Sequence, residues 1–275
     1  MSEGTSRSTH NGSDGAGSAG ENSSGPGGQG GNNGAAMLEA VELDLADVAR
    51  ATSWDAGRSG CLLHGFGASA QDLVSLAPML GGAQRWVFPH APASITVAGM
   101  AYGRAWFPRT EEELQQALFG GYFLSLRRLE PAGLAQAAWE VRRLVEGRNL
   151  AWETLILGGF SQGAMVVAEI LRQGLDNPKL PLPAVALLFS GALTAESWWT
   201  GLSTAGRSPG PHGANLPRVF QSHGTQDPVL PLREGEALRD ALTAAGFSVD
   251  WHQFTGRHEI PEPVVTAAAE FIRPN

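Results

Sequence analysis

The chain has 275 residues, a formal net charge of −8 and a single cysteine, Cys61. One cysteine excludes an internal disulfide and a multi-cysteine metal site, and an acidic chain without a basic cluster is unsuited to binding nucleic acid. Apolar runs fall short of the roughly 20 residues that span a bilayer, and the N-terminus lacks the apolar stretch of a signal peptide. These features predict a soluble, cytoplasmic protein without membrane insertion.

Residues 1–36 differ in composition from the rest of the chain. They contain 11 Gly, 7 Ser and 4 Asn, and apart from Met1 the only hydrophobic side chains are alanines. Such a segment buries too little apolar surface to offset the entropy that is lost when it becomes ordered. We therefore predict a disordered tail over residues 1–36 and one folded domain over residues 37–275, which is long enough to hold a substantial core.

Strands are predicted from about residue 40 onward. Val41, Leu43 and Leu45 alternate with acidic residues, which is typical of a half-exposed strand near the edge of a sheet. The later runs are short and continuously apolar, which indicates strands covered on both faces. They lie at residues 61–63, 86–88, 154–157, 185–189 and 218–220.

Helix-length amphipathic segments alternate with these runs. They cover residues 131–146, 232–246 and 264–272. Strands that alternate with helices predict an α/β fold, in which a mostly parallel sheet carries helices on both faces.

Two stretches fit this alternation poorly and are interpreted as insertions near one end of the sheet. Residues 99–130 are rich in aromatic residues and leucine, and residues 194–216 contain two tryptophans and a Gly/Pro-rich loop. Ligands of open α/β sheets bind beyond the carboxyl ends of the strands. Trp106 and Phe107 are therefore candidate substrate-binding residues, although such aromatics also pack satellite cores.

The pattern G-x-S-x-G occurs twice, at residues 159–163 and 206–210. In a chain with 36 glycines a match is weak evidence by itself. A nucleophile of this type requires a buried strand before the serine, a helix after it, and an N–H on the next residue to bind an oxyanion. Ser161 has all three, with Gln162 as the donor. Ser208 has neither flanking element and is followed by proline, so we discard it.

A serine nucleophile requires a histidine base that is oriented by a carboxylate, and in this fold the acid and then the histidine follow the serine. His258 lies in a loop directly after the predicted strand at residues 249–254, whereas His252 lies within that strand. Asp227 lies in a turn after the preceding strand that is fixed by the two prolines following it, Pro228 and Pro231, and His223 lies too close before it to be the base. Glu259 is a weaker candidate for the acid because neighbours in a tight loop point apart.

A second oxyanion donor is expected from the loop after an early strand, at residues 63–67. Phe66 is the candidate for its backbone N–H, because the glycines on both sides let the backbone approach a substrate. His64 is interpreted as a residue that shapes this loop and not as a base. Ser69 and Asp72 form an N-cap pair for the following helix.

Seven motifs in order resemble those of the phospholipase/carboxylesterase family of α/β-hydrolases, which includes acyl-protein thioesterases. They are LHGFG at 63–67, FPHAP at 88–92, AWF at 105–107, GFSQG at 159–163, FSG at 189–191, HGTQDPVLP at 223–231 and GRHEI at 256–260. The resemblance covers roughly residues 58–273. It implies an α/β-hydrolase fold, a Ser161, Asp227 and His258 triad, oxyanion N–H groups from Phe66 and Gln162, and hydrolysis of small-molecule esters or thioesters without a metal or other cofactor. Trp106 matches the family position beside the acyl pocket.

We therefore expect a serine esterase that cleaves carboxylic esters of small or medium acyl chains through an acyl-enzyme. The long stretch at residues 108–130 departs from compact family members, so their acyl-chain preference does not carry over. A thioesterase or lysophospholipase for longer chains is one alternative, suggested by the aromatic and leucine content of residues 99–130. A non-catalytic hydrolase fold that binds a ligand is another. A serine peptidase is less favoured, since such enzymes usually carry an additional domain.

Overall fold

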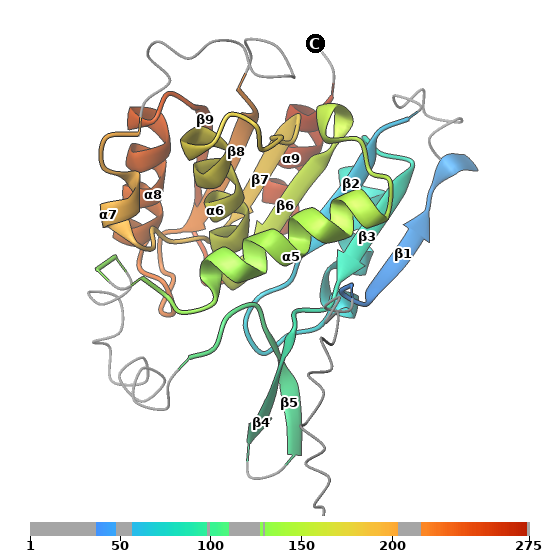
Figure 1. Ribbon diagram of the computed structural model, residues 1–275, viewed down its shortest axis with the longest axis horizontal. Helices are drawn as coiled ribbons and strands as arrows, with labels where there is room; N and C mark the ends of the chain where they lie inside the picture. Colours follow the sequence, from blue (N-terminus) through green and yellow to red (C-terminus); the bar gives the residue numbers. More distant parts are fainter. Residues whose placement is uncertain are drawn as a thin grey trace, which may run out of the picture. The chain divides into compact units, whose positions relative to one another are not determined.

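The computed structural model describes residues 37–47, 57–97, 100–109, 127–128, 130–202 and 216–273. Its main feature is a seven-stranded sheet in the order β1-β3-β2-β6-β7-β8-β9 (Figure 1). Only β1, at one edge, runs antiparallel to its neighbour, and the other pairs are parallel. The predicted edge strand and mostly parallel sheet are therefore confirmed. The strands are β1 (Ala40–Asp44), β2 (Ser59–Leu63), β3 (Arg85–Pro89), β6 (Ile156–Phe160), β7 (Val185–Phe189), β8 (Arg218–Gly224) and β9 (Ser248–Phe254).

Three parts of the sequence predictions lie outside the described residues. They are the tail at residues 1–36, residues 99, 110–126 and 129 of the first predicted insertion, and residues 203–215 of the second, including Ser208.

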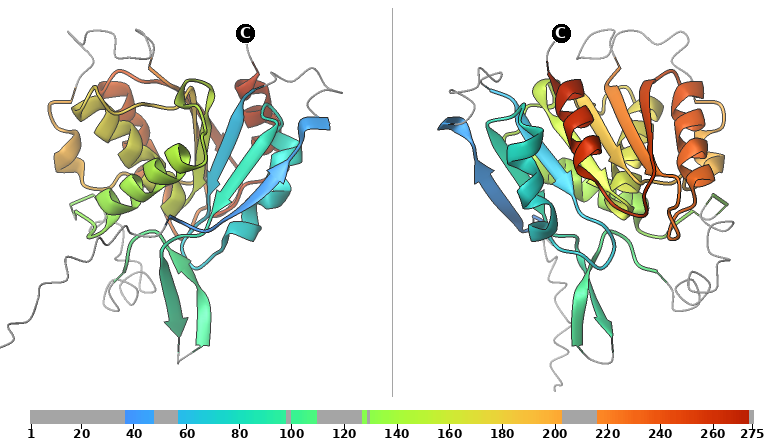
Figure 2. Two further views of the ribbon diagram at one scale, coloured as in Figure 1. Left: turned by 45° about the vertical axis from the view of Figure 1, so that its right-hand side comes forward. Right: turned by 180° about the vertical axis from the view of Figure 1, so that it is seen from behind.

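Helices cover both faces of the sheet (Figure 2). One face carries α5 (Leu134–Gly147), α6 (Gln162–Asp176) and α8 (Leu232–Ala244), and the other carries the 3₁₀ helix η1 (Ala70–Leu76), α2 (Ala77–Leu80) and α9 (Glu262–Ile272). Neighbouring strand residues point into opposite cores: Leu157 and Val219 join the first cluster, and Ile156 and Phe220 join the second. Burial on both faces explains why the strand sequences are continuously apolar.

Two element boundaries differ from the sequence predictions. The strand predicted at residues 154–157 begins instead at Ile156 and continues to Phe160, while Thr154 belongs to a 3₁₀ helix, η2 (Trp152–Thr154). The apolar run ends at Leu157 because the strand continues with Gly158, which has no side chain. A Cβ at this position would lie 2.6 Å from Leu62 Cδ2, so no side chain fits. The strand predicted at residues 218–220 continues as β8 to Gly224. Its residues at 221–223 are polar but fully buried, so an apolar pattern does not reveal them.

A second sheet was missed by the sequence reasoning. Strands β4 (Ala93–Val97) and β5 (Met100–Ala105) form an antiparallel hairpin that follows the carboxyl end of β3 and projects away from the main sheet (Figure 1). Met100 is 72% exposed and Tyr102 is 65% exposed. At the base of the hairpin, the Arg104 carbonyl accepts a hydrogen bond from Gly67 N–H at 2.9 Å. The hairpin is therefore anchored to the loop that follows β2.

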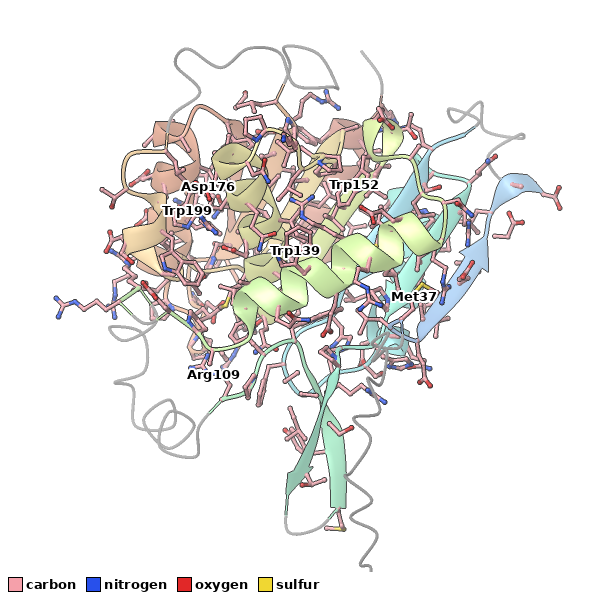
Figure 3. The ribbon with its side chains drawn as sticks, viewed as in Figure 1. Met37, Arg109, Trp139, Trp152, Asp176 and Trp199 are labelled. Carbon is pink, nitrogen blue, oxygen red and sulfur yellow. The ribbon has the colours of Figure 1, made fainter. Side chains whose placement is uncertain are left out.

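A buried arginine links α5 to α6, the helix that begins after Ser161. Arg142 on α5 donates to the carbonyl oxygens of Ile170 at 2.8 Å and Pro181 at 2.7 Å. Its guanidinium lies over the ring of Trp152 at 5.2 Å, whereas Trp139 projects from α5 into solvent (Figure 3). Burial lowers the pKa of Arg142 to about 10, so the side chain stays charged at neutral pH.

Candidate active site

Ser161 lies on a tight turn between β6 and α6, as the sequence pattern predicts. Its backbone has φ 55° and ψ −116°, and its N–H donates to the carbonyl of Phe189 at 2.9 Å. A positive φ is rare for a residue with a side chain and marks stored strain. A Cβ at Gly159 would collide with the backbone of Gly163, and a Cβ at Gly163 would collide with the Leu63 carbonyl. The two glycines of the motif are therefore required by close packing around this turn.

Asp227 and His258 are joined directly at the carboxyl end of the sheet. Asp227 follows β8 and His258 follows β9, and the Asp227 Oδ2 to His258 Nδ1 distance is 2.6 Å. The other oxygen, Oδ1, accepts the N–H groups of Val229 and Leu230, each at 2.8 Å. Both carboxylate oxygens therefore have partners, and the turn after β8 fixes the direction in which Asp227 faces His258.

Electrostatics keep Asp227 ionised. Burial alone would raise the pKa of this carboxyl, but the hydrogen bond and charge of His258, with the two backbone N–H donors, outweigh burial and lower it. A carboxylate only accepts hydrogen bonds, so His258 donates through Nδ1. In neutral His258 the lone pair is then on Nε2, the nitrogen required of a base.

Ser161 lies near this pair without a direct bond to it in the part of the chain that the structure describes. Ser161 follows β6, whereas Asp227 and His258 follow the adjacent strands β8 and β9. Strand β7 lies between β6 and β8 in the sheet. The ring of Phe160, which precedes Ser161, lies 4.8 Å from the His258 ring between centroids. The structure thus brings the expected nucleophile, base and acid to one end of the sheet. Hydrogen bonds to catalytic bases often tighten only when substrate is bound.

The loop after β2 runs alongside Ser161, as expected for an oxyanion loop. A Cβ built on Gly65 would lie 3.4 Å from the Cβ of Ser161. Gln162 is the first residue of α6, where backbone N–H groups have no partner within the helix. Within the described ranges, neither Phe66 N–H nor Gln162 N–H has an acceptor. The described structure therefore leaves both N–H groups without an intramolecular acceptor.

The side chain of Gln162 has a role that sequence reasoning missed. It is buried, its Oε1 accepts the backbone N–H of Trp106 at 2.8 Å, and its Nε2 donates to the carbonyl of Phe107 at 2.9 Å. This amide therefore clamps the segment after β5 to the Ser161 turn. Trp106 and Phe107 have 2% and 0% exposure, so both pack in the core of the described structure. A contact between either ring and substrate stays a prediction.

The histidines set aside at the sequence level have other partners. His223 is fully buried, and its Nε2 donates to the Leu230 carbonyl at 2.7 Å and lies 3.5 Å from Asp227 Oδ2. Burial lowers the pKa of His223, which keeps it neutral. His252 lies 3.1 Å from Asp250, and its ring stacks on Phe220. The His258 loop is therefore the one that provides Asp227 with its closest histidine.

The described residues show neither a metal-binding cluster nor a membrane-spanning helix. They contain no group of three or more His, Cys, Asp or Glu side chains arranged to hold a metal ion. None of their helices has the length and apolar character to cross a membrane.

The expected N-cap pair is present: Asp72 Oδ2 accepts both the N–H of Ser69, at 2.7 Å, and its hydroxyl, at 2.6 Å.

Comparison with known proteins decides the family. Residues 61–275 match the sequence profile of the phospholipase/carboxylesterase family. The chain belongs to this family. The predicted family and α/β-hydrolase fold are therefore confirmed, and the protein is an ester or thioester hydrolase.

Individual relatives and a solved structure support this conclusion. The chain is 26% identical to acyl-protein thioesterase 1 of Mycosarcoma maydis over 214 residues, which cover 70% of this chain and 80% of the relative. It is 28% identical to acyl-protein thioesterase 1 of Eremothecium gossypii over 228 residues, covering 78% and 86%. The crystal structure of esterase PE8 superposes with a TM-score of 0.63 at 25% identity, covering 86% of this chain and 98% of that one.

Proposed function

We propose that the protein is a serine hydrolase that cleaves carboxylic esters of small or medium acyl chains through an acyl-enzyme on Ser161. The observation that carries the proposal is the 2.6 Å bond between Asp227 and His258 at the end of the sheet where Ser161 occupies its strained turn. A positive-φ serine between a buried strand and a helix is the geometry of an exposed nucleophile above an α/β sheet.

The proposed reaction uses Asp227 as a carboxylate and His258 with its lone pair on Nε2. His258 Nε2 takes the proton of the Ser161 hydroxyl as Oγ attacks the acyl carbonyl carbon. The N–H groups of Phe66 and Gln162 bind the oxygen that becomes negative. His258 then gives the proton to the departing alcohol, and the acyl group stays on Ser161. Water then attacks the acyl carbon as the same histidine takes its proton, and His258 gives that proton to Ser161 Oγ as the bond between Oγ and the acyl carbon breaks, which releases the carboxylic acid and restores the enzyme. Asp227 stays ionised throughout and stabilises the charged imidazolium.

The packing of Trp106 and Phe107 supports a limit on acyl length. Both rings are already buried, and the Gln162 amide holds their backbone against the Ser161 turn. We place them as the wall at the end of the acyl site. A long chain would have to displace packed aromatic rings, which costs free energy because protein interiors are close-packed.

A second candidate is thioester hydrolysis on longer acyl chains. It is favoured by one observation, the similarity to proteins named acyl-protein thioesterase 1. The two candidates share the same proposed machinery and differ in the leaving group and the acyl chain. Rates with the acetyl, butyryl, octanoyl and palmitoyl esters of p-nitrophenol, and with the matching thioesters, separate them. A steep fall after butyryl supports the first candidate, and a maximum with palmitoyl thioester supports the second.

The nucleophile itself is tested by Ser161→Ala. We expect turnover of p-nitrophenyl butyrate to fall about 10⁴–10⁶-fold, as for serine proteases that lose their nucleophile. The control is Ser248→Ala, which changes an exposed serine at the start of β9, at the end of the sheet opposite the proposed site. A fluorophosphonate probe should label the wild type and not the Ser161 variant. Unlabelled, folded wild-type protein would favour a ligand-binding role instead, and full activity of the variant would exclude Ser161 as the nucleophile.

A further inference from the structure

His64, the residue after β2, has both ring nitrogens bonded to backbone. Its exposure is 1%, its Nδ1 lies 2.7 Å from the Gly65 carbonyl, and its Nε2 lies 3.1 Å from the N–H of Ala91. A carbonyl only accepts a hydrogen bond and a backbone N–H only donates one. The two partners together therefore require one form of the ring, with the proton on Nδ1 and the lone pair on Nε2. Burial also lowers the pKa of His64, which favours this neutral form.

The acceptor of the His64 proton belongs to a peptide unit that matters for the proposed reaction. The Gly65 carbonyl and the Phe66 N–H are the two ends of one planar peptide group. In a trans peptide these groups point in opposite directions. The Gly65 carbonyl also accepts the N–H of Ala68, at the longer distance of 3.3 Å, so the His64 ring is its shorter contact. By holding the carbonyl, the ring helps to fix the direction of the Phe66 N–H. This loop passes beside Ser161, since a Cβ on Gly65 would lie 3.4 Å from the Ser161 Cβ.

The ring is itself held firmly by its surroundings. Trp106 Nε1 donates to the His64 carbonyl at 2.8 Å, and the two rings lie 5.5 Å apart between centroids. The Ala91 carbonyl accepts Arg104 Nη1 at 3.0 Å, so the segment that donates to His64 is anchored to the base of the hairpin. His64 therefore couples the loop after β2 to the segment after β3 through contacts that leave its ring one orientation.

We propose that His64 is a positioning residue that sets the direction and donor strength of the Phe66 N–H toward the oxyanion. An amide whose carbonyl accepts a hydrogen bond is polarised and becomes a stronger donor at its N–H. His64 exchanges no proton with substrate in this role. The inference rests on the proposed function, because it assumes an oxyanion beside Ser161.

Two substitutions separate the roles of the two ring nitrogens of His64. In His64→Asn the amide nitrogen occupies the place of Nδ1, which keeps a donor for the Gly65 carbonyl and removes the acceptor for Ala91. In His64→Gln the amide reaches the place of Nε2, where its oxygen accepts from Ala91 and the donor to Gly65 is lost. Each variant loses one hydrogen bond of the ring. His64→Asn leaves the Ala91 N–H without its acceptor, whereas in His64→Gln the Gly65 carbonyl keeps the 3.3 Å bond from Ala68 N–H. A purely structural role therefore predicts the larger loss for His64→Asn, and the inference predicts it for His64→Gln.

The expected result is a split between these variants in kcat. With p-nitrophenyl butyrate we expect His64→Gln to lose about 10²–10³-fold in kcat with KM little changed, the effect of losing one oxyanion donor. We expect His64→Asn to stay within about tenfold of wild type. Inhibition by butylboronic acid, which forms a tetrahedral adduct on a serine, should weaken in proportion to kcat/KM. His252→Gln, a histidine distant from this loop, serves as the control and leaves kcat unchanged.

The outcomes distinguish this inference from the proposed function. A loss of kcat in His64→Asn as large as that in His64→Gln or larger, matched by the drops in thermal stability, would show a purely structural role and overturn the inference. So would a His64→Gln variant with wild-type kcat. In either case hydrolysis by the wild type and its loss in Ser161→Ala would leave the proposed function standing. A folded wild type that neither hydrolyses esters nor reacts with a fluorophosphonate overturns both.

A measurement on the wild type covers the case in which a variant does not fold. In ¹⁵N-histidine-labelled protein at neutral pH, both His64 and His258 should show a protonated Nδ1 and an unprotonated Nε2. The His64 signals are those that remain in His258→Asn, and in the wild type the His64 Nδ1–H signal should shift when the boronate adduct forms. A buried His64 with its proton on Nε2 would overturn the inference, because that form cannot donate to the Gly65 carbonyl.

Discussion

Replacing Asp227 by asparagine tests how the His258 proton is placed. In the structure Oδ1 of Asp227 accepts two backbone N–H groups at 2.8 Å, and Oδ2 lies 2.6 Å from His258 Nδ1. An amide has one oxygen, and the two backbone donors require it at the Oδ1 place. The amide NH₂ of Asp227→Asn therefore faces His258 and donates to Nδ1. The histidine proton then moves to Nε2, which can no longer accept a proton from Ser161.

The expected loss is large because the wrong nitrogen carries the proton. The equivalent substitution in a serine protease lowers kcat about 10⁴-fold with the geometry intact, which corresponds to about 5 kcal/mol of transition-state stabilisation. We expect a loss of the same order here, with KM for p-nitrophenyl butyrate little changed. Steady-state kinetics at neutral pH, together with thermal unfolding of each variant, measure both effects.

Asp227→Ala is the matched control for stability. It removes the acceptor of the Val229 and Leu230 N–H groups, whereas Asp227→Asn retains it. Hydrogen bonds to a charged group contribute about 1.5–3 kcal/mol each, so the alanine variant should unfold at a clearly lower temperature than the asparagine variant. A kcat for Asp227→Asn within tenfold of wild type would refute the tautomer argument.

Three further results are expected from the geometry of the site and the core. Because the pKa of folded Asp227 lies below its ordinary value of 3.8, its contribution to stability is complete above that pH and is lost as the pH falls through the lower, folded pKa; acid unfolding curves of wild type should be steeper there than those of Asp227→Asn. Gln162→Met leaves the buried N–H of Trp106 and carbonyl of Phe107 without partners, and at about 1–3 kcal/mol for each unpaired group its thermal unfolding midpoint should drop markedly; an unchanged midpoint would contradict the clamp. Burial raises the pKa of the Cys61 thiol to about 12, so Ellman's reagent should react with it only after unfolding.

The parts of the fold that were predicted correctly depend on neighbours in the sequence. Val185–Phe189 reads as a strand because five consecutive residues are apolar and buried. The turn at Ser161 is indicated by glycines two residues away on each side, a spacing that is visible within five residues of sequence. Such features need only a short window of sequence, so hydrophobic runs and glycine spacing reveal them.

The missed features depend on partners far apart in the sequence. Gln162 contacts Trp106 and Phe107 at separations of 56 and 55 residues, and His64 contacts Ala91 at a separation of 27. The variable position after the serine in G-x-S-x-G carries no information about what its side chain binds. The β4–β5 hairpin was missed for another reason: in that sheet its two strands pair with each other, and Ser94, Thr96, Met100 and Tyr102 are exposed, so no buried apolar run marks them.

The environments of His64 and His258 explain why two histidines near Ser161 are suited to different tasks. Both point Nδ1 at an oxygen, the Gly65 carbonyl for His64 and the Asp227 carboxylate for His258. The difference lies at Nε2. In His64 this nitrogen accepts the N–H of Ala91, so its lone pair is not free for substrate, and the residue is 1% exposed. In His258 no group among the described residues bonds to Nε2, and the side chain keeps 14% exposure. A negative carboxylate also stabilises imidazolium, whereas a neutral carbonyl in a buried site does so far less. The imidazole of His258 is therefore suited to transfer a proton, and that of His64 is suited to hold a peptide group. The N–H of Ala91, which binds Nε2 of His64, is the contact that separates the two roles.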